Sequence, residues 1–361
     1  LVCSPRGFGQ MSRQFHRAIR EHLIQDPCQG ERRPVLINNW EATYFDFDAD
    51  KLVEIAKTAA PLGIELFVMD DGWFGKRDDD NSGLGDWTVN TGKLPGGLEV
   101  LVPRLKELGM KFGIWIEPEM VSEDSDLYRE HPDWALRIPG RAPARGRNQL
   151  VLDFSRPEVR RHVYERIKAV LASADVSYVK WDMNRSLTDV YSAALPAQRQ
   201  GEVYHRYVLG VYEMLDWLRR DFPHILIEGC AGGGGRFDAG MLYYTPQIWC
   251  SDNTDAIDRL RIQYGTSFGY PVSAMGAHVS VTPNEENGRI TPMETRGVVA
   301  MSGTFGYEMD LSRTAGEDRE VIRRQVAFFK EHYDLIQRGD YYRLTDPFQN
   351  GPYTAWEHVS P

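Results

Sequence analysis

The 361-residue sequence has few of the residues on which several classes of protein depend. Its four cysteines, Cys3, Cys28, Cys230 and Cys250, are too sparse and too irregularly spaced for a disulfide framework or a CxxC metal site. The nine histidines form neither an HxH nor an HExxH pair, so the usual zinc signatures of hydrolytic enzymes are missing. We therefore expect no metal, and a reducing cytoplasm is the expected location.

Concentrated positive charge and long apolar runs are also missing. The formal net charge is -10, whereas a surface that binds nucleic acid needs clustered Lys and Arg. The most basic stretch, residues 140–147, is short, and it is interpreted as a solvated loop from which one Arg could reach a site. No apolar run approaches the ~20 residues that span a bilayer, and no signal peptide is visible. We expect no nucleic-acid or membrane partner.

The sequence does contain a regular alternation of apolar, strand-like runs with amphipathic helical stretches. The helical stretches, 50–63, 97–109, 156–174 and 203–222, have apolar residues at about every third or fourth position. Eight strands separated by helices predict an α/β fold, a closed parallel (β/α)8 TIM barrel. The predicted strands are 35–40, 64–73, 111–120, 149–154, 176–182, 224–229, 246–252 and 271–280.

The domain organisation follows from the length of this alternation. A barrel of this kind commonly takes roughly 200 to 400 residues as one domain, so residues 1–338 are assigned to it. Two further β-like runs, 341–346 and 353–360, are assigned to the start of a truncated C-terminal β-domain over 339–361. Because the chain begins without Met and stops just after these runs, we expect it to be an excised piece.

Acidic and aromatic residues stand where the predicted strands end, which is where barrel enzymes carry their chemistry. Asp182 ends the run YVKWD, with Lys180 two positions before it on the same side of the strand. Asp252 ends a second apolar run just before a predicted helix. Two such carboxylates are typical of an acid and a nucleophile that act on a sugar. The other strand ends carry Trp40, Asp70, Asp71, Trp115, Glu117, Glu119, Asp153, Cys230 and Asp255.

Several of these residues have a structural interpretation as well. Asp70 and Asp71 precede a glycine and are also typical of a turn. Trp40 and Trp115 are as compatible with the core as with a platform on which a sugar stacks, since Trp is usually largely buried.

The same holds for the remaining polar candidates. Glu117 and Glu119 share one face of their strand and could hold neighbouring loops instead of substrate. Cys230 could be a small buried apolar group. The glycine run at 231–238 lacks the Lys-Ser/Thr of a phosphate-binding loop, so a close backbone approach explains it better.

Six multi-residue segments agree in order and spacing with one known family. They are DDGWFG, WIEPEMV, YVKWDMNR, CAGGGGRFD, WCSDNTDAIDR and IQYGTS. On these motifs, and over essentially its whole length, the chain resembles the α-galactosidases of glycoside hydrolase family 36. The resemblance implies a retaining enzyme that removes terminal α-linked galactose from oligosaccharides of the melibiose and raffinose type, without a cofactor.

The resemblance also implies roles for individual positions. Asp182 matches the catalytic nucleophile, and Asp252 matches the general acid/base. Asp70 and Asp71 match the pair that binds the 4- and 6-hydroxyls of galactose. The other implied substrate-binding residues are Trp40, Trp115, Arg147 and Lys180, with Cys230, Gly233 and Arg236 of a CxxGxxR element near the 2-hydroxyl.

Two departures from the family pattern bear on the expected activity. Ala231 stands where many relatives have Ser, and we expect the family's large amino-terminal β-sandwich and small carboxy-terminal β-domain to be mostly absent. Full-length relatives often form homotetramers in which a neighbour helps to close the pocket. The alternatives are an α-N-acetylgalactosaminidase, a transgalactosylase of the same fold, or a galactose-binding remnant without catalysis.

Overall fold

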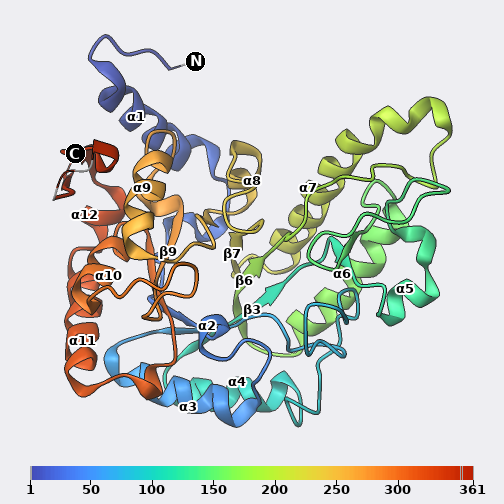
Figure 1. Cartoon of the computed structure of the whole chain (residues 1–361), viewed down its shortest axis with the longest axis horizontal. Helices are drawn as coiled ribbons and strands as arrows, with labels where there is room; N and C mark the ends of the chain where they lie inside the picture. Colours follow the sequence, from blue (N-terminus) through green and yellow to red (C-terminus); the bar gives the residue numbers. More distant parts are fainter. Residues whose placement is uncertain (1, 350, 352, 361) are drawn as a thin grey trace.

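A computed structural model describes residues 2–349, 351 and 353–360. Its main sheet is a closed barrel of parallel strands in the order β1-β10-β9-β8-β7-β6-β3-β2. Helices surround this sheet on the outside (Figure 1). The (β/α)8 barrel predicted from the alternating pattern is therefore confirmed. The barrel strands are β1 (Leu36–Asn38), β2 (Leu66–Met69), β3 (Lys111–Ile116), β6 (Val176–Trp181), β7 (Leu226–Gly229), β8 (Gln247–Trp249), β9 (Met275–Ser280) and β10 (Thr304–Glu308).

One predicted barrel strand was wrong. The run 149–154 contains β5 (Leu150–Val151), which pairs antiparallel with β4 (Met120–Val121) in a separate two-stranded sheet. Both strands lie in the long excursion between β3 and β6. A short apolar run indicates that a segment is buried, but it does not indicate which sheet the segment joins. Because β5 lies outside the barrel, Asp153 does not end a barrel strand.

The strand that completes the barrel, β10, was missed. Its sequence, TFGYE, is short and contains Gly306, which weakens a strand signal. The barrel requires glycine there, because a Cβ on Gly306 would lie 2.8 Å from the His278 ring and 2.9 Å from Leu36. Tertiary packing against β9 and β1 therefore determines this strand.

Helices form in each of the four amphipathic stretches that the sequence pattern predicts. In α6 (Pro157–Ala172), Pro157 starts the helix, and Val159, Val163, Ile167 and Val170 are buried along one face. The other helices are α1 (Gly7–Ala18), α2 (Trp40–Thr43), α3 (Ala49–Ala59), α4 (Leu98–Glu107), α5 (Asp126–Glu130), α7 (Val203–Asp221), α8 (Ala239–Tyr244), α9 (Ala256–Thr266), α10 (Met293–Ala300), α11 (Gly316–Glu331) and α12 (Tyr333–Arg338). Within the described residues, no helix is long and apolar enough to cross a membrane.

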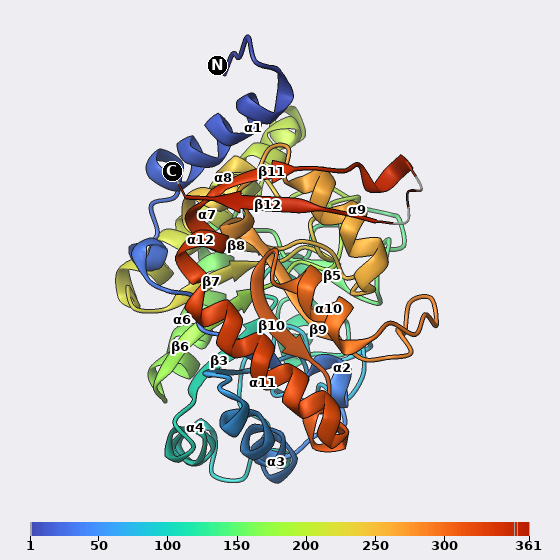
Figure 2. The ribbon, with the colours of Figure 1, turned by 90° about the vertical axis from the view of Figure 1, so that its left-hand side faces the viewer.

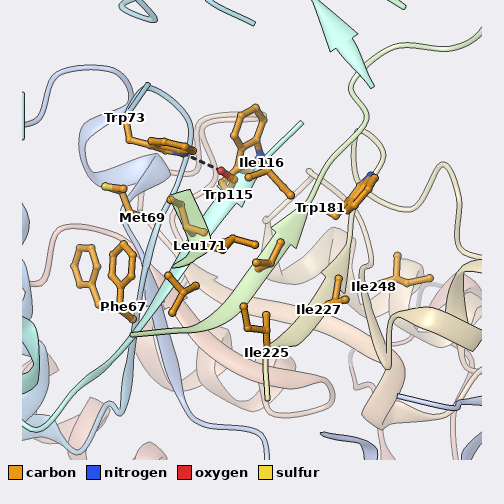
Figure 3. Close-up of a cluster of buried hydrophobic side chains, with 14 of the residues drawn as sticks. Phe67, Met69, Trp73, Trp115, Ile116, Leu171, Trp181, Ile225, Ile227 and Ile248 are labelled. Atoms are coloured by element: carbon orange, nitrogen blue, oxygen red, sulfur yellow. Dashed lines mark hydrogen bonds between the residues drawn. The ribbon is translucent and has the colours of Figure 1, made fainter. Parts of the chain in front are cut away.

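Large aromatic side chains fill the core on the side of β2 and β3. Trp73 and Trp115 are 1% and 2% exposed. The indole of Trp73 donates a hydrogen bond to the backbone oxygen of Trp115 at 2.8 Å (Figure 3). This contact ties the loop after β2 to β3, so the residues at the two strand ends are held in register.

The last described residues form a hairpin outside the barrel. Strands β11 (Asp340–Arg343) and β12 (Trp356–Val359) pair antiparallel and lie beside α1 (Figure 2). Arg17 of α1 pairs with Asp340 at 2.6 Å, and Arg343 donates to Ser12 at 2.5 Å. The assignment of 339–361 to the start of a further β-domain stays a prediction.

Candidate active site

The carboxyl ends of the barrel strands surround a pocket of about 320 Å³. The pocket is lined by eight of the eleven residues that were predicted from the sequence to act in catalysis or binding. Five strands, β1, β2, β3, β6 and β8, each present one or more of these predicted residues at or just beyond their end. The eight are Trp40, Asp70, Asp71, Trp115, Arg147, Lys180, Asp182 and Asp252.

Asp182, directly after β6, is 5% exposed and surrounded by donors. One carboxylate oxygen accepts from Trp115 Nε1 (3.1 Å) and Asn184 Nδ2 (2.8 Å), and the other accepts from the Met183 amide (2.8 Å). Burial alone would raise the pKa of Asp182. The Lys180 ammonium and a hydrogen bond from Cys230, with those from Asn184 and Trp115, outweigh burial and lower this pKa below its ordinary value. The carboxyl is thus held ionised.

Asp252, three residues after β8, has a different environment. Its Oδ1 accepts a hydrogen bond from Trp249 Nε1 at 3.0 Å. Burial, followed by the negative charge of Asp182, raises the pKa of Asp252 above its ordinary value, and Lys180 and Arg147 oppose this only in part. Two carboxyls in one pocket are therefore pushed toward opposite protonation states.

The aspartate pair after β2 is held by two separate cations. Asp70 accepts from Lys180 Nζ at 2.9 Å and from Asn38 Nδ2 at 2.6 Å. Asp71 accepts from Arg77, whose Nη2 lies 2.8 Å from Oδ2 and whose Nε lies 3.1 Å from Oδ1. Both carboxylates are buried, so their positions on the pocket wall are set before any ligand arrives.

The three residues of the CxxGxxR element do not line the pocket; they lie behind it. Cys230 is 3% exposed, and its thiol contributes to the lowered pKa of Asp182. A Cβ on Gly233, whose φ is +81°, would lie 2.7 Å from the Asp252 amide nitrogen, so only glycine fits against that loop. Arg236 pairs with Glu119 at 2.8 Å. Their expected place near a 2-hydroxyl stays a prediction.

The two glutamates after β3 differ in what they hold. Glu119 accepts from Trp181 (2.9 Å) and Tyr207 (2.6 Å) as well as pairing with Arg236, so it anchors the wall. Glu117 accepts from the Asn184 amide and from Gln149. Burial and the charge of Asp182 raise the pKa of Glu117 to about 8. Neither glutamate lines the pocket.

Eight residues that line the pocket were not predicted from the sequence to do so. Asn184 and Trp249 stand in the recognised motifs, two and three residues from the aspartates that they contact, so their positions carried a usable signal. Glu308 ends β10, and finding that strand would have placed Glu308 on the rim. Thr254 also stands in a recognised motif, two residues after Asp252. The other four come from the short helix α2, the residue after it and a loop, without a pattern of their own. The eight are Glu41, Tyr44, Asn184, Trp249, Thr254, Glu285, Glu286 and Glu308.

Glu41 and Glu308 add a second pair of carboxyls to the pocket wall. Burial and the charge of Glu308 raise the pKa of Glu41 to about 8. Burial would also raise the pKa of Glu308, but a hydrogen bond with His278 at 2.9 Å and the charge of Lys180 lower it. Near neutral pH one member of this pair is protonated and the other ionised, which limits the negative charge of the pocket.

Known proteins match this chain along its whole length. The family model described as Melibiase matches residues 1–339. Alpha-galactosidase AgaA of Geobacillus stearothermophilus is 56% identical over 360 residues, which are 100% of this chain and 49% of AgaA. Alpha-galactosidase 1 of Pediococcus pentosaceus is 54% identical over 100% of this chain and 49% of its own length. The chain thus spans about half the length of these curated relatives.

Solved structures agree with the same assignment. The crystal structure of AgaA, described as a GH36 alpha-galactosidase, has a TM-score of 0.96 and covers 98% of this chain and 49% of its own. A substituted form of AgaA in complex with stachyose has a TM-score of 0.97 at 56% identity and covers 99% of this chain and 50% of its own. The resemblance to glycoside hydrolase family 36 is confirmed, and the chain belongs to the Melibiase family.

Proposed function

We propose that this chain is the catalytic barrel of a retaining α-galactosidase that hydrolyses terminal α-linked galactose by double displacement. The observation that carries the proposal is the pair of aspartates at the ends of β6 and β8, whose pKa values are shifted in opposite directions within one pocket. A glycosidase needs one ionised and one protonated carboxyl flanking the scissile bond. The α-galactosidases among the relatives, and the AgaA complexes with stachyose and raffinose, support galactosides as substrates.

In the proposed mechanism Asp182 attacks the anomeric carbon while Asp252 gives its proton to the departing glycosidic oxygen. The glycosidic bond breaks through an oxocarbenium-like transition state, and a galactosyl ester of Asp182 forms. Asp252, then a carboxylate, takes a proton from water, and that water opens the ester. Two inversions leave galactose in its α configuration, which requires the carboxyls to lie about 5–5.5 Å apart.

The remaining pocket residues are proposed to hold the sugar. Asp70 and Asp71 accept hydrogen bonds from the 4- and 6-hydroxyls, and Lys180, fixed by Asp70, donates beside them. Trp40 and Trp115 present ring surface to the apolar face of the pyranose, and Arg147 closes the wall near Asp80, 3.8 Å away. Contacts of this kind favour a monosaccharide-sized terminal unit over a long chain.

The test is hydrolysis of p-nitrophenyl α-galactoside by this chain, with NMR following the anomer that is released first. We expect α-galactose, because the double displacement retains configuration. Initial release of the β-anomer would contradict a retaining mechanism. Galactose binding by calorimetry without turnover would favour a binding remnant, and the absence of both would contradict the galactose assignment.

A further inference from the structure

The carboxyl of Asp252 is oriented by a tryptophan that is itself packed in place. Trp249, the last residue of β8, is 2% exposed, and its Nε1 donates to Asp252 Oδ1 at 3.0 Å. The Arg259 guanidinium packs over the Trp249 ring at 4.5 Å from its centroid. The His278 ring lies 4.5 Å from the same indole, tilted by 38°. The hydrogen bond to Asp252 therefore comes from a group with little freedom to move.

Arg259 also holds the backbone on both sides of Asp252. Its Nη2 donates to the Ser251 oxygen at 2.5 Å and its Nε to the Asn253 oxygen at 2.7 Å. Its Nη1 donates to the Gly276 oxygen in β9 at 3.0 Å. Because the guanidinium is planar and its donors are fixed in a fork, these three bonds lock the loop after β8 onto the neighbouring strand.

The loop after β8 is also contacted by the glycine run at 231–238. A Cβ on Gly233 would lie 2.7 Å from both the Asp252 nitrogen and the Ser251 Cα, so the backbone there is already at its closest approach.

Arg259, at 3% exposed, is too buried for its charge to serve solubility. Desolvation disfavours a buried cation, and its carbonyl contacts must offset that cost.

We propose that Arg259 is a positioning residue for the general acid/base. It fixes the Asp252 carboxyl through two routes, the Trp249 ring and the carbonyls of Ser251 and Asn253. This inference rests on the proposed function, in which Asp252 protonates the leaving group. Proton transfer demands hydrogen-bond geometry, and a misplacement of about 1 Å can cost about 100-fold in rate.

The test compares two substrates in the Arg259→Lys variant. Lysine keeps the charge but lacks the planar fork, so the loop loosens. We expect kcat/KM on melibiose to fall about 100-fold, and kcat/KM on 2,4-dinitrophenyl α-galactoside to change less than about 3-fold, because that leaving group departs without a proton. Trp249→Phe keeps an aromatic ring and removes the donor, and we expect a selective loss of about 10-fold on melibiose.

Arg33→Lys is the matched control. Arg33 is also 3% exposed and donates to two backbone oxygens, of Cys28 and Glu31, both at 3.0 Å, but it precedes β1 and lies outside the pocket. We expect the ratio of kcat/KM between the two substrates to stay as in the unsubstituted chain. Equal losses on both substrates, or no loss on either, in a folded Arg259→Lys protein would overturn the proposal. If that variant does not fold, the Trp249→Phe ratio decides in the same way.

Crystal structures separate this inference from the proposed function. If the unsubstituted chain hydrolyses neither glycoside, the proposed function fails, and the position of Asp252 remains measurable. In the structure of Arg259→Lys we expect the Asp252 carboxyl and the backbone of 251–253 to be displaced by about 1 Å. An unmoved carboxyl would overturn the positioning role.

Discussion

The ends of β6 and β8 present the same residue type to the same pocket in opposite electrostatic settings. At β6, Asp182 lies near the Lys180 cation and accepts hydrogen bonds from Asn184 and Trp115, which lower its pKa. At β8, Asp252 accepts from Trp249, and burial and the charge of Asp182 raise its pKa. The surroundings of the two aspartates, and not their residue type or their place on a strand, therefore favour the ionised form of one and the protonated form of the other, as their proposed roles of nucleophile and acid require.

Removing the β6 carboxyl is expected to have the largest effect. Asp182→Ala leaves no group to form the covalent intermediate, so kcat/KM on p-nitrophenyl α-galactoside should fall by about 10⁴-fold or more. The folded state is checked by circular dichroism. Turnover within tenfold of the unsubstituted chain would show that the β6 side is not the nucleophilic side.

Removing the β8 carboxyl should separate substrates instead of abolishing all turnover. Asp252→Ala should lower kcat/KM on melibiose or raffinose by about 10²–10⁴-fold. The value on 2,4-dinitrophenyl α-galactoside should change far less, since its leaving group needs no proton. Added azide should restore the second step of that reaction by replacing water. Equal losses on both substrate types would contradict the assignment of Asp252 as the acid.

Asp70 binds Lys180, the cation that also lowers the pKa of Asp182, and Asp70 is proposed to contact the sugar as well. Asp70→Asn keeps the shape and removes the charge that accepts from Lys180. We expect KM to rise and kcat to fall, for a combined loss of about 10- to 100-fold, the order of a hydrogen bond to a charged group. The control is Asp153→Asn: Asp153 is also buried, but it accepts from Ser155 and Ser192 away from the pocket. Unchanged kinetics in Asp70→Asn would remove Asp70 from the sugar site.

The pH profile should show the two environments as separate limbs. Activity should fall toward acid as Asp182, whose folded pKa lies below its ordinary value, takes up a proton. It should fall toward alkali as Asp252, whose pKa lies above its ordinary value, loses one. Both limbs are read from kcat/KM against pH in the free enzyme. A profile without an alkaline limb would contradict Asp252 as the acid.

The smallest effect is expected for one donor to Asp182. Asn184→Ala removes the 2.8 Å hydrogen bond that favours the ionised form, so the pKa of Asp182 should rise. The acidic limb should then move toward higher pH while the alkaline limb stays, with less than about a 3-fold change at the optimum. A shift of both limbs together would show that Asn184 acts on the whole pocket.

Much of the barrel could be predicted because its signals are local. Seven of the eight predicted strand runs overlap barrel strands, since an apolar run between amphipathic helices marks a buried parallel strand. The run 149–154 was wrong, because a buried apolar segment does not indicate which sheet it joins. The strand β10 was missed, because Gly306 weakens the local strand signal while it satisfies the packing of β9 and β1. Glu308, the last residue of β10, was therefore not predicted to line the pocket.

Four pocket residues could be placed from local pattern alone, because Asp70, Lys180, Asp182 and Asp252 stand at the ends of correctly predicted strands and parallel strands bring their carboxyl ends to one edge. The surroundings of each carboxyl, in contrast, depend on contacts that form only in the folded chain. The donors to Asp182 include Trp115, 67 positions away, and Lys180 is held by Asp70, 110 positions away. A pKa depends on burial and on distances in space, which no local pattern carries.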